Sequence, residues 1–171
     1  MTAVPRLGAL AVFAGIVGGA CGDPVPAGVA GPAFPVSTDL LAGATGLLTC
    51  DPLPADSVTR IVGPAGGAVE VGPHRLVVPA GALSADVAIT GVTRPESVRR
   101  IDFRPDGLAF AESASLTMSY AGCGLVALPP LRIAYVSDDL VILEYLISLT
   151  DTSAREVTAS LHHFSNYAVA W

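Results

Sequence analysis

Three cysteines are the residues of this chain whose type and spacing point most directly to covalent chemistry: Cys21, Cys50 and Cys123. An odd number of cysteines in an exported protein leaves one thiol unexplained. If Cys21 carries a lipid, Cys50 and Cys123 form an even pair and, in an oxidising compartment, a disulfide. This bond would close a loop of roughly 70 residues, worth about 4 kcal/mol in the chain-entropy model. The alternative is two buried free thiols; a metal site is disfavoured because neither cysteine has a partner at ligand spacing.

Lysine chemistry is excluded, since all nine basic residues are arginine. Schiff-base catalysis, pyridoxal attachment and the phosphate-binding P-loop all need a lysine. Segment 122–127 formally matches a GxGxxA dinucleotide fingerprint, but prolines at 129–130 follow it instead of a helix that could hold a pyrophosphate. The GxSxG elbow of a Ser/His/Asp hydrolase is missing too. We therefore expect no cofactor.

The histidines and aspartates give only weak metal signals. His74 with His162 or His163 could bind a metal, but no spacing singles out such a set, and surface histidines are the default. Asp138 and Asp139 could suggest calcium, although a two-acid hairpin turn is the simpler interpretation. We expect no metal site.

The composition is that of one folded domain. The chain has 171 residues, of which 51% are hydrophobic and 14% charged, and its formal net charge is −6. A generic disordered chain would be rich in charge and poor in apolar residues. The acidic balance argues against nucleic acid as a partner.

Residues 1–20 have the features of an export signal. Arg6 supplies the positive charge, residues 7–17 form an uncharged apolar run too short to span a bilayer, and small residues precede Cys21. This cleavage region resembles a bacterial lipobox, in which the cysteine is lipidated and becomes the new N-terminus. Gly18 stands where the lipobox usually carries leucine. Plain secretion after cleavage before Cys21 is the alternative.

Residues 21–57 are expected to form a tether and an N-terminal extension. Prolines at positions 24, 26, 32 and 35 exclude a regular helix or a central strand over 22–36. Residues 37–48 are expected either to begin a short helix or to lie against the domain, and Gly43 and Gly46 disfavour the helix.

From residue 58 to 171 the pattern predicts an all-β domain, an antiparallel β-sandwich of about nine short strands. Turn signals lie at Gly72-Pro73-His74, Pro105-Asp106-Gly107 and Asp138-Asp139. Segment 140–149 is nearly all apolar, which favours a central strand buried on both faces, with a short helix as the competing interpretation. The expected strands cover residues 68–71, 75–78, 87–92, 98–103, 115–120, 131–137, 140–149, 156–161 and 166–170.

Several short motifs resemble the ZU-five domain family, which includes many bacterial envelope proteins. Segments 66–71 (Gly-Gly-Ala-Val-Glu-Val) and 76–83 (Leu-Val-Val-Pro-Ala-Gly-Ala-Leu) are similar to its opening hairpin. Segment 103–110 resembles its Pro-x-Gly-x-x-Phe motif, and 163–169 resembles the closing strand of bacterial members. The resemblance spans residues 61–171 and implies a β-sandwich-like fold used mainly for protein–protein contact. Core positions are then expected at Leu76, Val78, Phe110, Leu116 and Phe164.

The same resemblance supplies one candidate chemistry. Some proteins that contain ZU-five domains cleave themselves between Phe and Ser of a His-Phe-Ser sequence, and His163-Phe164-Ser165 has that form. The Ser165 hydroxyl would attack the Phe164 carbonyl in an N→O acyl shift, a base would take its proton, and water would hydrolyse the ester. His163 lies two residues before Ser165, so in a strand both side chains point to one face. The alternative is that Phe164 packs in the core while His163 and Ser165 face solvent.

Taken together, these features predict a non-enzymatic envelope protein, membrane-anchored or secreted, whose β-sandwich mediates protein–protein interaction or a structural role. Its expected partners are membrane lipid, through an anchor on Cys21, and another envelope protein that the sequence does not identify. The expected location is the bacterial cell envelope as a lipoprotein, or otherwise the periplasm or the outside of the cell. The alternative is a self-processing domain that cuts its own Phe164–Ser165 bond.

Overall fold

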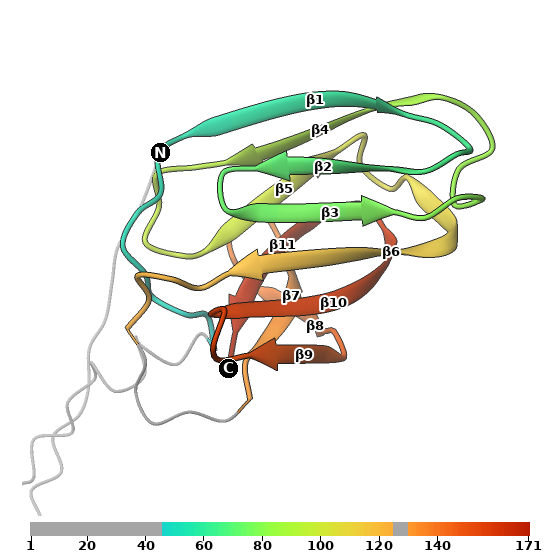
Figure 1. The fold of residues 1–171 in the computed structure, drawn as a ribbon. Helices are drawn as coiled ribbons and strands as arrows, with labels where there is room; N and C mark the ends of the chain where they lie inside the picture. Colours follow the sequence, from blue (N-terminus) through green and yellow to red (C-terminus); the bar gives the residue numbers. More distant parts are fainter. Residues whose placement is uncertain (1–45, 125–129) are drawn as a thin grey trace, which may run out of the picture. The chain divides into compact units, whose positions relative to one another are not determined.

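The computed structural model describes residues 46–124 and 130–171, and in this part of the chain every regular element is a β-strand (Figure 1). The expected leader, Cys21, the tether and the second half of the 122–127 glycine motif lie outside the described residues. Eleven strands follow one another along the chain: β1 (Asp56–Val62), β2 (Gly67–Val71), β3 (His74–Val78), β4 (Val87–Thr93), β5 (Arg100–Arg104), β6 (Ala109–Ser119), β7 (Arg132–Val136), β8 (Ile142–Tyr145), β9 (Ser148–Asp151), β10 (Glu156–His163) and β11 (Asn166–Ala170).

The strands form two packed antiparallel sheets, which confirms the predicted all-β antiparallel sandwich. The six-stranded sheet has the order β1-β4-β5-β11-β7-β8, and the five-stranded sheet has the order β2-β3-β6-β10-β9. Both sheets therefore end, on one side of the sandwich, in the successive strands β8 and β9 (Figure 1).

Alternating side chains build the core between the sheets. In β3 the burial alternates strictly along His74–Val78, as expected for a strand with one face on the core. The predicted core residues are confirmed as buried, and they belong to one cluster that both sheets share: Leu76, Val78, Phe110, Leu116 and Phe164.

Strand β11 is central in the six-stranded sheet. It lies between β5 and β7, and all five of its residues are buried. A second small apolar cluster explains the burial of its other face, where Ala168 and Ala170 pack with Leu47, Ala134 and Val136. The closing strand of the chain is thus held on both edges and both faces.

The predicted central strand over 140–149 is wrong. This segment forms two four-residue strands, and each is the last strand of a different sheet. Five of its large apolar side chains are exposed: Val141, Leu143, Tyr145, Ile147 and Leu149. An apolar run describes composition and not position in a sheet, so it could not distinguish a central strand from a crossing between two edges.

Strand β1 was missing from the prediction, and with the division of 140–149 it raises the strand number to eleven. Only the last of its seven residues is buried, so its sequence lacks a strong apolar alternation. The predicted turns at 105–107 and 138–139 are confirmed between β5 and β6 and between β7 and β8, and the turn predicted at 72–74 is confined to residues 72–73 because His74 begins β3. In the turn between β5 and β6, Gly107 has a φ of 70°, a conformation that favours glycine.

Candidate functional site

The predicted disulfide between Cys50 and Cys123 is present, and its two cysteines are 73 positions apart in the sequence. It fastens the segment before β1 to the connection that follows β6. Backbone hydrogen bonds flank it on both sides, from Asp51 N to the Gly122 carbonyl (2.8 Å) and from Gly124 N to the Thr49 carbonyl (3.0 Å). Because disulfides persist in oxidising compartments, this bond indicates an exported environment for the domain.

The His-Phe-Ser motif forms the crossing from one sheet to the other. Strand β10 of the five-stranded sheet ends at His163, and β11 of the six-stranded sheet begins at Asn166. Phe164 is buried at this crossing, stacked on Phe103 (centroids 5.1 Å apart) and edge-on to Phe110 (4.9 Å). Core packing by Phe164 is therefore confirmed, and the side-chain alternation of a single strand does not apply between His163 and Ser165.

Two groups approach the carbonyl oxygen of Phe164. The backbone N–H of Gly107 donates a hydrogen bond to it (3.1 Å), and Nδ1 of His163 lies 3.4 Å from it. Within the described residues, no hydrogen bond joins the His163 ring to the Ser165 hydroxyl. Donors at the carbonyl oxygen of a bond that is to be attacked are the groups that would stabilise a developing oxyanion.

A hollow of about 400 Å³ opens beside this crossing. Apolar side chains come from Tyr135 and Leu143, while Asp106 and Asp138 contribute carboxylates. The hollow thus joins four segments distant in sequence: the β5–β6 turn, strand β7, the turn into β8, and the β10–β11 crossing. His163, Ser165 and Asn166 line it as well.

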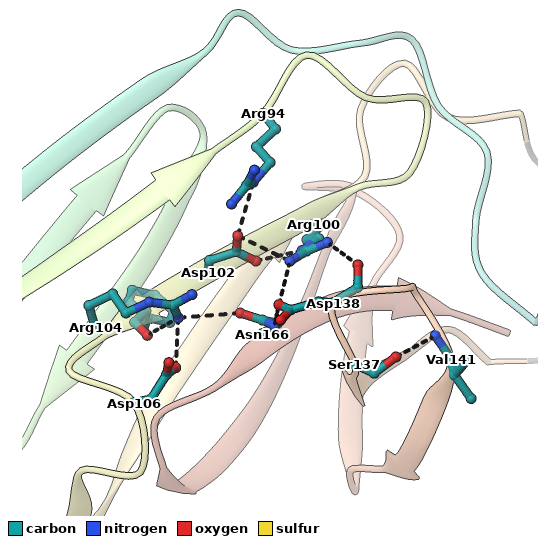
Figure 2. A network of polar contacts seen from close by, with 10 residues as sticks. Arg94, Arg100, Asp102, Arg104, Asp106, Ser137, Asp138, Val141 and Asn166 are labelled. Atoms are coloured by element: carbon teal, nitrogen blue, oxygen red, sulfur yellow. Dashed lines mark hydrogen bonds and ion pairs between the residues drawn. The ribbon is translucent and has the colours of Figure 1, made fainter.

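A polar network supports one side of the hollow (Figure 2). Buried Arg100 donates to Asp102 from Nε (2.5 Å) and from Nη2 (3.2 Å), and Arg94 donates to the same carboxylate (3.1 Å). Arg100 also donates to the backbone carbonyl of Asp138 (3.1 Å), whose side chain accepts from Asn166 Nδ2 (2.9 Å). The network therefore holds the β7–β8 turn against β5 and β11.

On the other side of the hollow, Arg104 orients Asp106. Its Nη1 donates to Asp106 Oδ1 (2.6 Å) and to the carbonyl of Phe103 (3.0 Å), and it reaches Asn166 Oδ1 at 3.5 Å. Both carboxylates of the hollow stay largely accessible, since the Asp106 and Asp138 side chains are 65% and 85% exposed. Each carboxylate also has an arginine partner, because Arg104 donates to Asp106 and Arg100 Nη2 lies 3.5 Å from Asp138 Oδ1.

The histidines have separate surroundings. His74 is buried in β3, and its Nδ1 accepts a hydrogen bond from Ser119 N (3.2 Å). Burial, with the nearby charge of Arg99, lowers the pKa of His74 to about 4. His162 is exposed on β10, with Nδ1 3.1 Å from the Ser113 hydroxyl. Among residues 46–124 and 130–171 no three potential ligand side chains are grouped for a metal ion.

The most accessible apolar surface is one that the sequence did not predict. We define the β8–β9 edge as Val141, Leu143, Tyr145, Ile147 and Leu149, with Ile147 96% and Leu149 78% exposed. Two further hollows, of about 300 and 350 Å³, lie along it at Tyr145 and Ile147. Within segment 140–149, Glu144 and Ser148 are the two residues that interrupt the apolar run. They were the only signal in the sequence that this segment is not a buried strand.

Comparison with known proteins does not assign the chain to a family. Neither a protein-family model nor a curated protein matches it. In the part of the chain that is described, there is no helix long and apolar enough to cross a membrane. The fold and the site thus define a disulfide-bonded β-sandwich with an exposed apolar edge.

Proposed function

We propose that this protein is a non-enzymatic cell-envelope component whose β-sandwich binds another protein through the β8–β9 edge. The observation that carries the proposal is the exposure of five large apolar side chains over residues 141–149, the segment that contains the two successive edge strands β8 and β9. Each fully exposed Val, Leu or Ile side chain forgoes about 1.5–3 kcal/mol of burial free energy. Exposed apolar surface beyond scattered single side chains marks a candidate interaction site, and these five side chains lie within nine consecutive residues, 141–149.

The resemblance to ZU-five domains supports the same class of function, because that family is used mainly for protein–protein contact. We further propose that Cys21 carries the lipid anchor and that residues 22–45 connect it to the sandwich. In this arrangement the partner is a protein of the same envelope. Palmitate labelling that is lost in Cys21→Ala would support the anchor, and labelling that persists in this variant would contradict it.

Co-purification from the native envelope tests the interaction. Leu149→Arg places a charge on the β8–β9 edge, whereas Ile61→Arg makes the same change on β1, at the opposite edge of the six-stranded sheet, where Ile61 is 75% exposed. We expect a partner to be recovered with the unmodified chain and with Ile61→Arg, and to be lost with Leu149→Arg. Recovery that is equal in both variants would contradict a role for the edge.

A second candidate function is self-cleavage at Phe164–Ser165, favoured by the Gly107 N–H that donates to the Phe164 carbonyl. In this reaction the Ser165 hydroxyl oxygen bonds to the Phe164 carbonyl carbon, the Phe164–Ser165 C–N bond breaks, and the hydroxyl proton ends on the Ser165 nitrogen, which becomes a free amine. Water then hydrolyses the ester and releases residues 165–171. Gly107 N–H would stabilise the oxyanion, with His163 beside it.

Mass analysis under denaturing conditions tests this candidate. Since β11 is paired on both edges, the released peptide would stay bound in the native protein, and only a denatured sample would reveal two masses. The candidate predicts two masses for the unmodified chain and one for Ser165→Ala. A single full-length mass in both samples would dispose of it.

A further inference from the structure

We propose that β8 receives an extended segment of the partner protein as an added strand, and that a lysine or arginine of this segment enters the hollow between Asp106 and Asp138. The inference rests on the proposed function and specifies the chemistry of the partner segment. Strand addition supplies affinity through main-chain hydrogen bonds and specificity through pockets for alternate side chains.

The open backbone belongs to β8 rather than to β9. Strand β8 pairs with β7 on one side and is the last strand of its sheet. Strand β9 also ends a sheet, but its side chains bond the backbone before and within β7. The Ser148 hydroxyl accepts from Ile133 N (3.0 Å), and the Thr150 hydroxyl donates to the Leu131 carbonyl (3.0 Å). An incoming strand therefore finds its hydrogen-bonding edge at β8.

The hollow beside β8 matches a basic side chain. Leu143 of β8 lines the hollow, and Tyr135 of the paired strand contributes an aromatic ring. Lysine and arginine carry an apolar stem and a charged end, so the stem would contact these side chains while the cation shares the exposed carboxylates of Asp106 and Asp138 with Arg104 and Arg100. A cation near the Tyr135 ring gains a further attraction.

Charge also selects the partner over a second copy of this chain. Acidic residues stand along the same edge, with Glu144 within β8 and Asp138 and Asp139 in the turn before it. Antiparallel pairing of two β8 strands would bring these like charges together, which is destabilising. The chain has a net charge of −6, which favours a basic segment of a different protein over a second copy of this chain.

Selection from a display library of random peptides of about twelve residues against the purified full chain tests the inference. We expect enriched peptides to carry a lysine or arginine with apolar, strand-forming residues two positions away on either side. N-methylation of alternate backbone amides of the best peptide should abolish its binding, because it removes the donors of the added strand. No enrichment, or enriched peptides without a basic residue, would overturn the inference.

Matched variants then locate the bound peptide. Leu143→Lys should weaken binding at least about tenfold, since a charged side chain on an edge strand opposes pairing, whereas Ile61→Lys on β1 should leave it unchanged. Asp106→Asn should weaken binding about fivefold and reduce its salt dependence, with Glu112→Gln on β6 as the control. Binding that is indifferent to Leu143→Lys and Asp106→Asn would overturn the inference.

The two proposals can fail separately. If Leu149→Arg abolishes recovery of the envelope partner but Leu143→Lys and Asp106→Asn leave peptide binding unchanged, the β8–β9 edge is supported as the interaction surface and strand addition is contradicted. If the envelope partner survives Leu149→Arg, the proposed function fails, whatever the peptides show.

Discussion

Asn166 Nδ2 donates a 2.9 Å hydrogen bond to Asp138 Oδ1 and thereby links the first residue of the central strand β11 to the turn before β8. The bond joins a mostly buried amide to a carboxylate whose side chain is 85% exposed. With Arg100 bonded to the Asp138 carbonyl, it sets the position of the turn from which the exposed edge starts. The interaction surface is therefore held by the interior of the sheet and not only by its own two short strands.

Loss of this hydrogen bond should destabilise the domain. Asn166→Ala removes the donor to a charged acceptor and the amide oxygen near Arg104, which should lower the free energy of unfolding by about 1.5–3 kcal/mol. Denaturant titration measures the change. Asp139→Asn, at the exposed neighbouring position of the same turn, is the control and should change stability by less than about 0.5 kcal/mol. Equal stabilities for the two variants would show that the bond contributes little.

The disulfide should contribute a large share of the stability. It joins residues 73 apart, so the chain-entropy model gives about 4 kcal/mol for the restriction of the unfolded chain. Replacing both Cys50 and Cys123 with serine should lower the free energy of unfolding by about this amount, and reductant should destabilise only the unmodified chain. Unchanged stability on reduction would contradict the prediction.

Stability should fall in mild acid because of His74. The pKa of His74 is lowered from 6.5 to about 4 in the folded state. Between these two pH values the imidazole is protonated in the unfolded chain but stays neutral in the native chain. Stability therefore decreases as the pH falls from 6.5 to about 4 and loses about 3 kcal/mol from this residue. Unfolding titrations at pH 7, 5.5 and 4 should show a shallower decline for His74→Gln. The same pH slope in both proteins would rule out His74 as the cause.

The aromatic cluster at the sheet crossing should be sensitive to truncation. Phe164 is buried between the rings of Phe103 and Phe110, so Phe164→Ala should cost about 3–5 kcal/mol of unfolding free energy. Leu149→Ala removes an exposed side chain and should change stability by less than about 0.5 kcal/mol. Thermal or chemical unfolding compares the two. A small loss in Phe164→Ala would mean that the crossing is not part of the core.

Local sequence predicted those parts of the fold that a strand or a turn encodes by itself. Strand β3 was predicted from its apolar residues and the Gly72-Pro73 turn before it, and the disulfide from the odd number of cysteines. Strand β1 was not predicted because most of its residues are exposed, so its sequence shows no strong apolar alternation. The position of segment 140–149 at the edges of the sheets depends on which distant strands pair with it, and no local sequence pattern encodes these pairings.

The hollow could not be predicted for the same reason. Asp106 and Asp138 are more than 30 residues apart in the sequence. They line the same hollow because Asp106 follows β5 and Asp138 follows β7, and both strands pair with β11. The sequence singled out His163, Phe164 and Ser165 for their order along the chain. It gave no sign that Gly107 N–H would reach the Phe164 carbonyl, because that contact joins the two sheets.

Site-specific photo-crosslinking in the native envelope tests the central claim most directly. A benzophenone side chain at position 149 reports contacts of the β8–β9 edge, and the same group at position 61 reports contacts of β1, where the native residue is also highly exposed. We predict a discrete adduct of higher mass from position 149 and none from position 61. Adducts at neither position, or equally at both, would contradict the assignment of the β8–β9 edge as the interaction surface.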